Sequence, residues 1–442
     1  MKDDLFLVGE RVLREMRRGG ADEVIVLPSE RESMMVRFSN GKVTVVQNWD
    51  LVGVDVLSIF GKKRIISRFE DTTEEGLSRA ARRVVKEAAL SPESEDLAPL
   101  PGGSLFPDRS DSGEIVPEKI NDDVVLAINA AEREGAKRVS GVFTASRRRD
   151  AIIGSNGLEG YDEGPLFEIN IRAFGEEGES GQSLSCGTGM GQLEPERAGR
   201  EAGTIVRQSK NREVWSEGKY NVLLGPIIAA NLLEDIGGAC SAFSVEAGTS
   251  CLAGKIGERV LSDRLTVIDD GASEGGLSTR SFDDEGTPTR RTALVDHGVL
   301  KTYMHNVTTA KKFNASSTGN AGWVAPGPWN LLVDSGDLSM EEALGELDNG
   351  IYVVSNWYTR FQNYSTGDFS TICRDGTFLV RNGEIKGALK GARISDNLLR
   401  LFSSIKGLGR ERRWVRWWEV RTPTLLPAMV IADVPFTKAQ ES

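Results

Sequence analysis

Two adjacent carboxylates, Glu234 and Asp235, follow an apolar run in the segment NLLEDIGGAC (residues 231–240), which has the pattern of a helix. A helix of this kind could carry a catalytic metal if it also supplied histidines, because a catalytic zinc site usually takes two or three of them and keeps one position for water. The segment has no histidine. The whole chain has two, His297 and His305, on a predicted β-ribbon. The carboxylates therefore either use other chemistry or mark a site without a metal.

Glu234 and Asp235 could bind a hard cation or act directly as general acid and base. Neighbouring residues on a helix point about 100° apart, so the two side chains do not converge on one ion unaided. Gly237 and Gly238 indicate that the helix ends close by. We therefore favour a polar helix face here, and a metal-free catalytic pair is the alternative.

A second group of acids lies in the segments VIDDG and SFDDEGTP. Its members are Asp269, Asp270, Asp283, Asp284 and Glu285. A calcium loop places carboxylates at alternate positions around a glycine, and this spacing does not match. Asp-Gly and Glu-Gly pairs are typical of turns between strands, so we expect these residues to shape turns.

Thiols are the other candidate nucleophiles. The four cysteines are far apart in the sequence and form no CxxC motif, which predicts reduced thiols. They are Cys186, Cys240, Cys251 and Cys373. A catalytic pair of a histidine with Cys251 or Cys373 is the less favoured interpretation, because buried inert cysteines are commoner. The chain has no GxSxG elbow of a serine hydrolase.

Basic and aromatic residues are interleaved in the segment GRERRWVRWWEVR (residues 409–421), which includes Trp414, Arg416 and Trp418. Such a mixture can bind single-stranded nucleic acid by charge and stacking. It equally suits a protein interface, where Trp and Arg are enriched among the residues that contribute most to binding. The formal net charge of −11 disfavours nucleic acid. We expect a subunit interface, and packing within the chain is the alternative.

The segment SSTGNAGW (residues 316–323) is rich in small residues. Asn320 could present its amide to a peptide backbone, and Gly319 and Gly322 would let an extended chain approach closely. A cleft that takes a peptide as an additional strand would use such residues. A tight turn beside the core explains the composition equally well.

Turn signals and amphipathic runs indicate how the chain is organised. Asn40-Gly41 and Asn382-Gly383 each join two β-rich runs, as in hairpins. Many strands joined by short turns, with a few helices, indicate an α+β fold with mixed or antiparallel sheets and flanking helices. We predict an N-terminal α+β domain (1–90), a linker rich in Pro, Ser and Gly (91–120), a central α+β domain (121–217) and a β-rich C-terminal domain (218–442).

The composition is that of a globular protein, with 39% hydrophobic and 27% charged residues among 442. No apolar stretch is long enough to cross a membrane, and the opening MKDDLFLVGE does not have the pattern of a secretory signal. We expect a soluble cytoplasmic protein with no membrane association.

Several motifs in the second half of the chain carry a resemblance to a known family. They are LAGKIGERVLSDRLTVIDDG (252–271), STGNAGW (317–323), DNGIYVV (348–354), STGDFS (365–370) and FLVRNGEI (378–385). In this order they resemble the TldD/PmbA family, whose members have carried the label of DNA gyrase modulators. The hairpin FSNGKVTVVQ (38–47) matches the first domain of that family more loosely. The resemblance extends over essentially the whole chain.

The resemblance implies one of two kinds of subunit. TldD-like chains carry an HExxxH metal motif on a helix and a late cysteine ligand, whereas TldE- or PmbA-like chains lack both and pair with them in a complex that degrades small unfolded peptides. Here Glu234, Asp235 and Ala239 occupy the motif positions, and residues 420–434 contain no cysteine. The chain is similar to the PmbA/TldE branch.

That branch implies that this chain binds no metal and that a zinc-type metal sits in a TldD-like partner. It further implies a heterodimer with that partner, or a homodimer, acting on unfolded peptides. Two alternatives stay open. One is a self-sufficient peptidase with a non-histidine site at Glu234 and Asp235, and the other is a non-enzymatic binding protein that modulates DNA gyrase.

Overall fold

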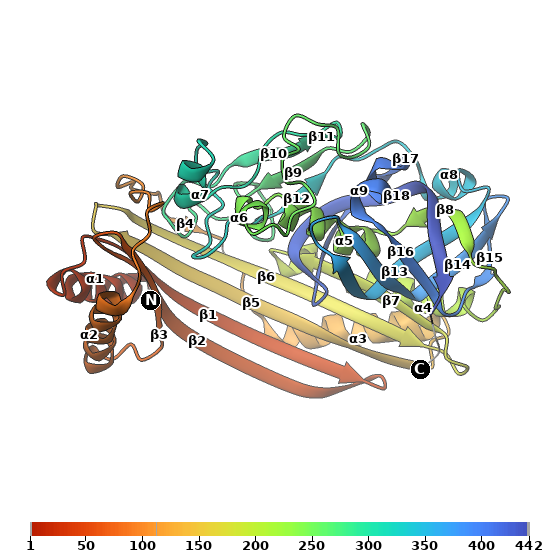
Figure 1. Cartoon of the computed structure of the whole chain (residues 1–442). Helices are drawn as coiled ribbons and strands as arrows, with labels where there is room; N and C mark the ends of the chain where they lie inside the picture. The colour runs from red at the N-terminus through yellow and green to blue at the C-terminus, as the bar shows by residue number, and fades with distance from the viewer. Residues whose placement is uncertain (1, 112, 440–442) are drawn as a thin grey trace.

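The computed structural model describes residues 2–111 and 113–439. It arranges them as two β-sheets, a long curved sheet from the first half of the chain and a second sheet from the C-terminal half, which lies above one end of the first (Figure 1). The fold is therefore α+β, with antiparallel and mixed sheets and flanking helices, as predicted. No helix in this part of the chain has the length and apolar character needed to cross a membrane.

The first sheet joins the predicted N-terminal and central units in one layer. Its strands, in order across the sheet, are β3 (Lys63–Phe69), β2 (Lys42–Phe60), β1 (Glu23–Ser39), β5 (Arg138–Gly154), β6 (Glu159–Phe174) and β4 (Arg109–Ser110), and β7 (Ser180–Gly187) also pairs with β6. β1 pairs antiparallel with β5, from Ile25 opposite Gly154 to Phe38 opposite Gly141. Backbone hydrogen bonds along this pair hold the two units together. The chain crosses between them through residues 91–111 and 113–116, which are mostly irregular.

Helices cover one face of the first sheet. α1 (Lys2–Arg18) and α2 (Glu74–Leu90) pack on one end of it, and α3 (Pro117–Arg133) and α4 (Pro195–Gln208) pack on the other. Val24, Val26, Val36 and Phe38 of β1 point to these helices. These four residues lie on the same face because side chains alternate between the two faces along a strand. α3 and α4 approach closely at Gly199, where a Cβ atom would lie 2.1 Å from the carbonyl oxygen of Ala127.

The opposite, concave face of the first sheet looks toward the C-terminal domain. Near one end, Ile25 and Leu27 of β1 pack with Phe282 of that domain. Farther along, the face is polar and lines a hollow. The outer edge of β2 flanks this region, because β3 pairs only with residues 54–60 of β2. Five apolar residues near that edge are exposed: Val43, Val45, Val46, Leu51 and Val52.

The predicted hairpins are confirmed. Asn40 and Gly41 join β1 to β2 with φ angles of 52° and 70°. Asn382 and Gly383 likewise join two strands of the second sheet with φ angles of 52° and 75°. Asn and Gly tolerate this left-handed region better than other residues, which is why the sequence signal is reliable. Thr73 caps α2, since its hydroxyl accepts a hydrogen bond from the Gly76 N–H.

The second sheet is built from the remaining strands. They are β8 (Gly218–Leu224), β9 (Val267–Asp270), β10 (Arg291–Asp296), β11 (Val299–Leu300), β12 (Leu331–Val333), β13 (Asn349–Asn363), β14 (Asp368–Arg381), β15 (Glu384–Ala388), β16 (Ala392–Asn397), β17 (Ile405–Trp417) and β18 (Val420–Lys438). β18 pairs with both β16 and β8, so the strands β8, β13, β14, β16 and β18 close into a ring.

Helix α5 (Pro226–Ala239) packs against this ring and carries the segment that contains Glu234. Pro226 starts it at a position where the missing N–H costs nothing. Its apolar residues are buried almost all round, as expected of a core helix. The helix continues through Gly237, where a Cβ atom would lie 2.8 Å from Leu331 Cδ1. Short helices α6 (Ala242–Glu246), α7 (Val307–Lys312), α8 (Met340–Gly345) and α9 (Leu398–Ser403), and the 3-10 turn Met190–Gln192, complete the fold.

Candidate functional site

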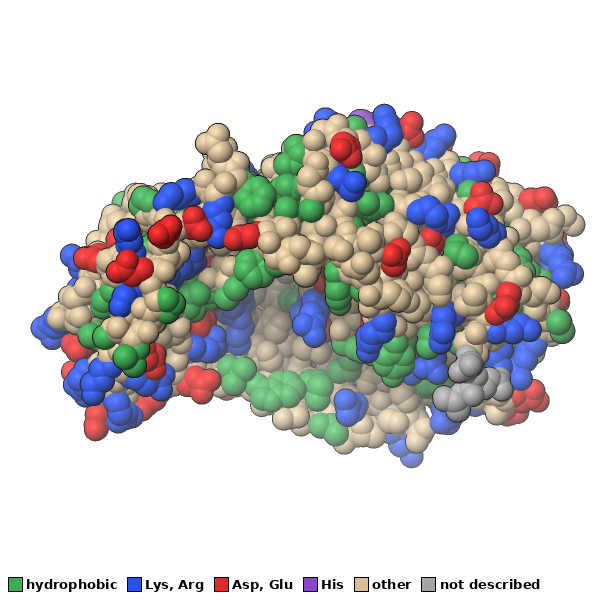
Figure 2. Space-filling model, in the orientation of Figure 1, with side chains coloured by type: hydrophobic (Ala, Val, Ile, Leu, Met, Phe, Trp, Pro, Cys, Tyr) green, Lys and Arg blue, Asp and Glu red, His purple; other side chains and the backbone are tan. Residues whose placement is uncertain are grey.

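A hollow lies between the concave face of the first sheet and the C-terminal domain, and basic side chains gather in it above a hydrophobic rim (Figure 2). It contains two adjoining cavities. The one called here the Asn320 cavity has a volume of about 450 Å³, and the one called the arginine cavity has a volume of about 430 Å³. They share Arg31, Arg280 and Trp329 as lining residues. The two sizes are in the range of small-molecule and peptide sites.

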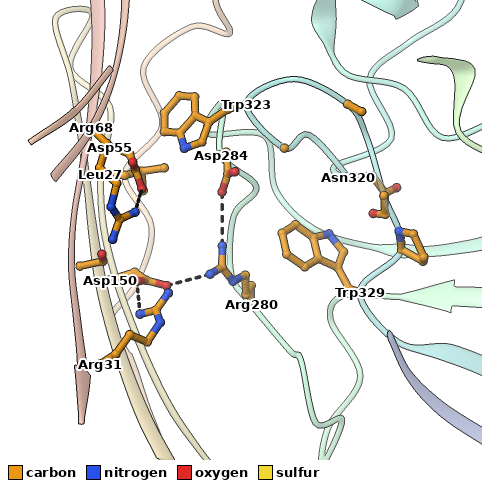
Figure 3. Close-up of a pocket in the computed structure, with 15 residues that line it drawn as sticks. Leu27, Arg31, Asp55, Arg68, Asp150, Arg280, Asp284, Asn320, Trp323 and Trp329 are labelled. Atoms are coloured by element: carbon orange, nitrogen blue, oxygen red, sulfur yellow. Dashed lines mark hydrogen bonds and ion pairs between the residues drawn. The ribbon is translucent and has the colours of Figure 1, made fainter. Parts of the chain in front are cut away.

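A buried carboxylate, Asp150 of β5, lies at the junction of the two cavities (Figure 3). It accepts hydrogen bonds from Arg31 at 2.7 Å, from Arg148 at 2.5 Å and from Arg280 at 2.9 Å. Burial by itself opposes a charge on Asp150, but the three guanidinium groups outweigh it and lower the pKa of the carboxyl. Arg280 belongs to the C-terminal domain, so this cluster joins the two sheets.

A second buried carboxylate, Asp162 of β6, extends the same network. Its Oδ1 accepts from Arg109 and Arg148, each at 3.0 Å. Its Oδ2 accepts from the backbone N–H of Ser281 at 2.5 Å. Arg109 and Arg148 also both donate to the carbonyl oxygen of Thr279 at 3.2 Å. Residues 279–281 are therefore fixed to the first sheet by charged hydrogen bonds.

Arg280 connects the network to the Asn320 cavity. Its guanidinium lies over the ring of Trp329, 5.0 Å from the centroid, and its Nη1 is 3.4 Å from Asp284. Burial raises the pKa of Asp284 to about 6 although Arg280 lowers it in part. Asp284 therefore gains a proton within a mildly acidic range. This is the one member of the second acidic group with a side chain in either cavity.

Asn320 lines the first cavity, as the peptide-cleft interpretation requires, and is almost fully buried. Its Nδ2 donates to Asp269 at 2.5 Å and to the carbonyl oxygen of Gly327 at 3.1 Å. Both partners are acceptors, which sets the orientation of the amide. The Oδ1 atom has no hydrogen-bond partner among the described residues. A buried acceptor without a donor is unusual in a folded protein, which makes Asn320 a candidate functional residue.

The two predicted cleft glycines have different positions. Gly322 lines the Asn320 cavity, where a Cβ atom would lie 2.8 Å from the Ala325 carbonyl oxygen. Gly319 has a φ angle of 72°, and its Cβ would lie 2.3 Å from the carbonyl oxygen of Pro288. Its own carbonyl accepts from Trp329 Nε1 at 2.8 Å. Gly319 thus supports the turn and the cavity wall without lining the cavity.

The three residues that the family resemblance assigns to the metal motif, Glu234, Asp235 and Ala239, all lie on α5. Glu234 is already engaged, because Oε1 accepts from the N–H groups of Arg421 at 3.0 Å and Thr422 at 2.6 Å. Asp235 has a pKa raised to about 7, first by burial and then by the charge of Glu234. Ala239 offers only a methyl group. Within residues 2–111 and 113–439, no three His, Cys, Asp or Glu side chains are placed to hold a metal ion.

The other acids of the second group hold the backbone in place. The Asp269 carboxylate also accepts from the N–H groups of Trp329 and Asn330. Asp283 accepts from three N–H groups, those of Glu285, Thr287 and Ala321. This is the architectural role expected from the sequence.

The candidate nucleophiles are placed unfavourably for catalysis. The four cysteines are free thiols and all are buried. Burial raises the pKa of Cys251 to about 11 and raises the pKa of Cys373 even further. Neither cysteine therefore forms a thiolate readily. His297 is exposed in the β10–β11 turn, whereas His305 is buried with a lowered pKa.

In the segment rich in Trp and Arg (residues 409–421), some side chains pack within the chain and others are exposed. Trp414 packs against the core, and Arg416 forms an ion pair with Glu168 of β6, so both contribute contacts within the chain. Trp418 is 56% exposed, and its ring lies 5.0 Å from that of Trp357. Tyr358 beside it is 47% exposed and has a φ angle of 59°, an uncommon conformation for an aromatic residue.

Comparisons with known proteins agree with this architecture. The chain matches models of the PmbA/TldA metallopeptidase C-terminal domain over residues 217–438, the central domain over 111–210 and domain 1 over 29–88. The chain therefore belongs to the PmbA/TldD metallopeptidase family. This places the two cavities at the meeting of all three family domains.

Two relatives illustrate the range of similarity in sequence. An uncharacterised protein of Methanocaldococcus jannaschii is 28% identical over 310 residues, which cover 68% of this chain and 71% of the relative. Metalloprotease PmbA of Escherichia coli O157:H7 is 27% identical over 230 residues, 52% of this chain and 50% of that protein. The chain thus matches about half the length of some of its relatives.

Solved structures share the fold along nearly the whole chain. The crystal structure of TldE from Thermococcus kodakarensis has a TM-score of 0.87 at 20% identity, and it covers 97% of this chain and 100% of that one. A Thermotoga maritima protein described as a candidate modulator of a DNA gyrase has a TM-score of 0.85 at 23% identity, with 98% and 100% covered. At these identities the likeness concerns the fold alone.

Sequence reasoning missed the ion network. This network brings together Asp150, Asp162 and Arg280, which are far apart in the sequence and meet only in the tertiary structure. The one local signal is the run Arg147–Asp150, four charged residues in the middle of a strand pattern. Because side chains alternate between the two faces of a strand, some of these consecutive charges must point to the buried face of the sheet. A buried charge is costly unless it has a partner of opposite charge.

The first prediction concerns the network. Asp150→Asn should lower the free energy of unfolding by about 3–5 kcal/mol, because it leaves three partly buried guanidinium groups without the buried anion that they share. Chemical denaturation monitored by tryptophan fluorescence measures this. The matched control is Asp296→Asn, an exposed partner of Lys301, which should change stability by less than about 1 kcal/mol. Equal effects of the two variants would contradict the assignment.

The second prediction concerns the pH dependence due to Asp235. Its folded pKa of about 7 lies above the unfolded value of 3.8. The folded state therefore binds the proton more tightly, and the contribution of Asp235 to stability is lost as the pH rises through about 7. Asp235→Asn should remove this loss, which is at most about 4 kcal/mol above neutral pH, and should have little effect at about pH 4. Unfolding curves across this range test it, and parallel curves for variant and parent would refute it.

Proposed function

We propose that this chain is the TldE/PmbA-like subunit of a peptidase complex in which a TldD-like subunit holds the zinc-type metal. The observation that carries the proposal is that the motif positions on α5 offer no free set of metal ligands. At the motif positions, Glu234 is bound to the backbone of β18 and Ala239 has no donor atom. The family membership supplies the peptidase context. Hydrolysis would then take place on the partner, and this chain would shape the space that receives the substrate.

Small unfolded peptides are the substrate class that fits such a division of labour. The hollow is open toward the edge of the first sheet, and an extended peptide can enter it more readily than a folded domain. The free Oδ1 of Asn320 would accept a backbone N–H of such a peptide, an interaction that does not depend on its sequence. Folded proteins have few backbone N–H groups available for this contact.

Two exposed features support assembly with a partner subunit. Trp418 and Tyr358 present aromatic surface around Trp357, and residues of this kind often contribute most to binding at interfaces. Residues 42–53 of β2 form a strand edge with exposed valines, and proteins rarely leave such an edge uncovered. The partner is a TldD-like subunit, and a second copy of this chain is the alternative. We also propose a cytoplasmic location, which the four free thiols support.

The third prediction tests the complex itself. The purified chain mixed with a TldD-like subunit should elute as one complex of the summed mass and cleave unfolded peptides, whereas the chain alone should be inactive and should hold no stoichiometric metal. Chelation should abolish activity of the complex. Size-exclusion chromatography with light scattering, elemental analysis and a peptide-cleavage assay measure these outcomes. Formation of a stable homodimer and no hetero-complex would contradict the proposal.

The same assay separates the self-sufficient peptidase from the proposed subunit. Asp235→Asn should leave cleavage by the complex within about twofold of the parent value, because a residue outside the reacting atoms contributes little to the barrier. Cleavage by the chain alone that disappears in Asp235→Asn would instead establish a catalytic site on α5.

The fourth prediction concerns the interface. Trp418→Ala should weaken association with the TldD-like subunit by at least about tenfold, corresponding to about 1.4 kcal/mol or more. Titration with light scattering or interferometry measures the dissociation constant. Tyr364→Ala is the matched control, since Tyr364 is 59% exposed but stacks on Phe361 away from Trp418. Equal affinities of the parent and the Trp418→Ala variant would exclude this surface as the interface.

A further inference from the structure

The arginine cavity has a charge opposite to that of the whole chain. Six arginines line it: Arg31, Arg109, Arg148, Arg280, Arg416 and Arg421. Among the described residues of its lining, Asp111 is the one acid. The chain as a whole carries a formal net charge of −11. Buried acids behind the wall neutralise part of this charge, as Asp150 and Asp162 show. The arginine cavity is therefore a cationic surface on an acidic protein, and such a surface attracts anions.

Two of the six arginines, Arg416 and Arg421, take no part in the network around Asp150 and Asp162. Arg421 is exposed, and its side chain has no hydrogen bond or ion pair with any described residue, because only its backbone N–H bonds to Glu234. Arg416 bonds to Glu168 through Nη1. A guanidinium has five N–H donors and matches a carboxylate in a bidentate geometry. These two residues can therefore bind a carboxylate without breaking the network.

The rest of the wall favours a peptide over a nucleic acid. Leu51, Pro165, Leu166, Leu277 and Pro423 also line the cavity and provide apolar contacts for side chains. Trp329 is the aromatic residue of the described lining, and Arg280 already occupies one face of its ring. Binding of single strands depends on stacking of bases on aromatic rings.

We propose that the arginine cavity binds carboxylate groups of an extended peptide, from acidic side chains or from the C-terminus, through Arg421 and Arg416. This rests on the proposed function, since it assigns a charge preference to the peptide substrate. The proposed binding is non-covalent and includes no chemical step. The cavity retains acidic segments beside the Asn320 cavity, which binds backbone, so acidic unfolded peptides are selected over neutral or basic ones.

The test is direct binding to the isolated full chain, measured by fluorescence anisotropy with labelled unfolded peptides. One peptide carries several glutamates, a second has glutamine at the same places, and a third has lysine. The acidic peptide should bind at least about tenfold more tightly than the glutamine peptide, and the lysine peptide should bind most weakly. An acidic peptide with a free C-terminus is compared with its amidated form, which separates the two sources of carboxylate.

The variants assign the effect to the cavity. Arg421→Gln should reduce affinity for the acidic peptide by about tenfold, and Arg421→Glu should abolish the preference. Arg381→Glu is the matched control, because Arg381 is exposed, lies outside the cavity and undergoes the same change of charge. It should leave affinity unchanged.

Three results would overturn the proposal: no binding of any peptide, equal affinities for the acidic and glutamine peptides, or equal losses in Arg421→Glu and Arg381→Glu. Tighter binding of a single-stranded oligonucleotide than of the acidic peptide would also overturn it, in favour of nucleic acid. The assay contains no TldD-like subunit. Failure of the complex to form therefore leaves the charge preference testable, and loss of the preference leaves the subunit assignment intact.

Discussion

The pairing of Asp150 with Arg280 is the contact on which the architecture of the hollow depends. Asp150 belongs to the first sheet and Arg280 to the C-terminal domain. A buried carboxylate is costly unless cations surround it, and three guanidinium groups do so here. The position of the domain over the sheet is therefore coupled to the satisfaction of this charge. Residues 279–281 are held by Arg109 and Asp162 as well, so several hydrogen bonds fix the wall that the two cavities share.

The proposed peptide site would depend on this wall, because the network determines which polar groups remain available in the two cavities. The network engages Arg31, Arg109, Arg148 and Arg280, whereas Arg421 and Arg416 lie outside it. Asn320 is likewise fixed by Asp269, with one oxygen left unpaired. The free groups in both cavities are thus those that the internal contacts do not use. Helix α5 shows the opposite case, since the Glu234 carboxylate is already bound to the backbone of β18.

Local features were predictable from the sequence, and long-range ones were not. Asn40-Gly41 determines its hairpin because the turn conformation is a property of those two residues. Asn320 was recognised as a possible peptide contact from its small neighbours, but its unpaired oxygen follows from Asp269, which is 51 residues away in the sequence. The pairing of β1 with β5 and the closure of β18 on β8 join segments far apart in the chain. Hydrophobic periodicity carries no information about such pairings, and it gave no hint of Arg280 beside Asp150.

A double-mutant cycle on Asp150 and Arg280 tests the central claim most directly. Unfolding free energies of Asp150→Asn, Arg280→Gln and the double variant give the coupling between the two side chains, free of the separate effects of each substitution. If this pair holds the C-terminal domain over the sheet, the coupling should be at least about 1.5 kcal/mol, within the range for groups in contact in one network. A coupling below about 0.5 kcal/mol, typical of independent sites, would show that the domain is held by other contacts and would contradict the account.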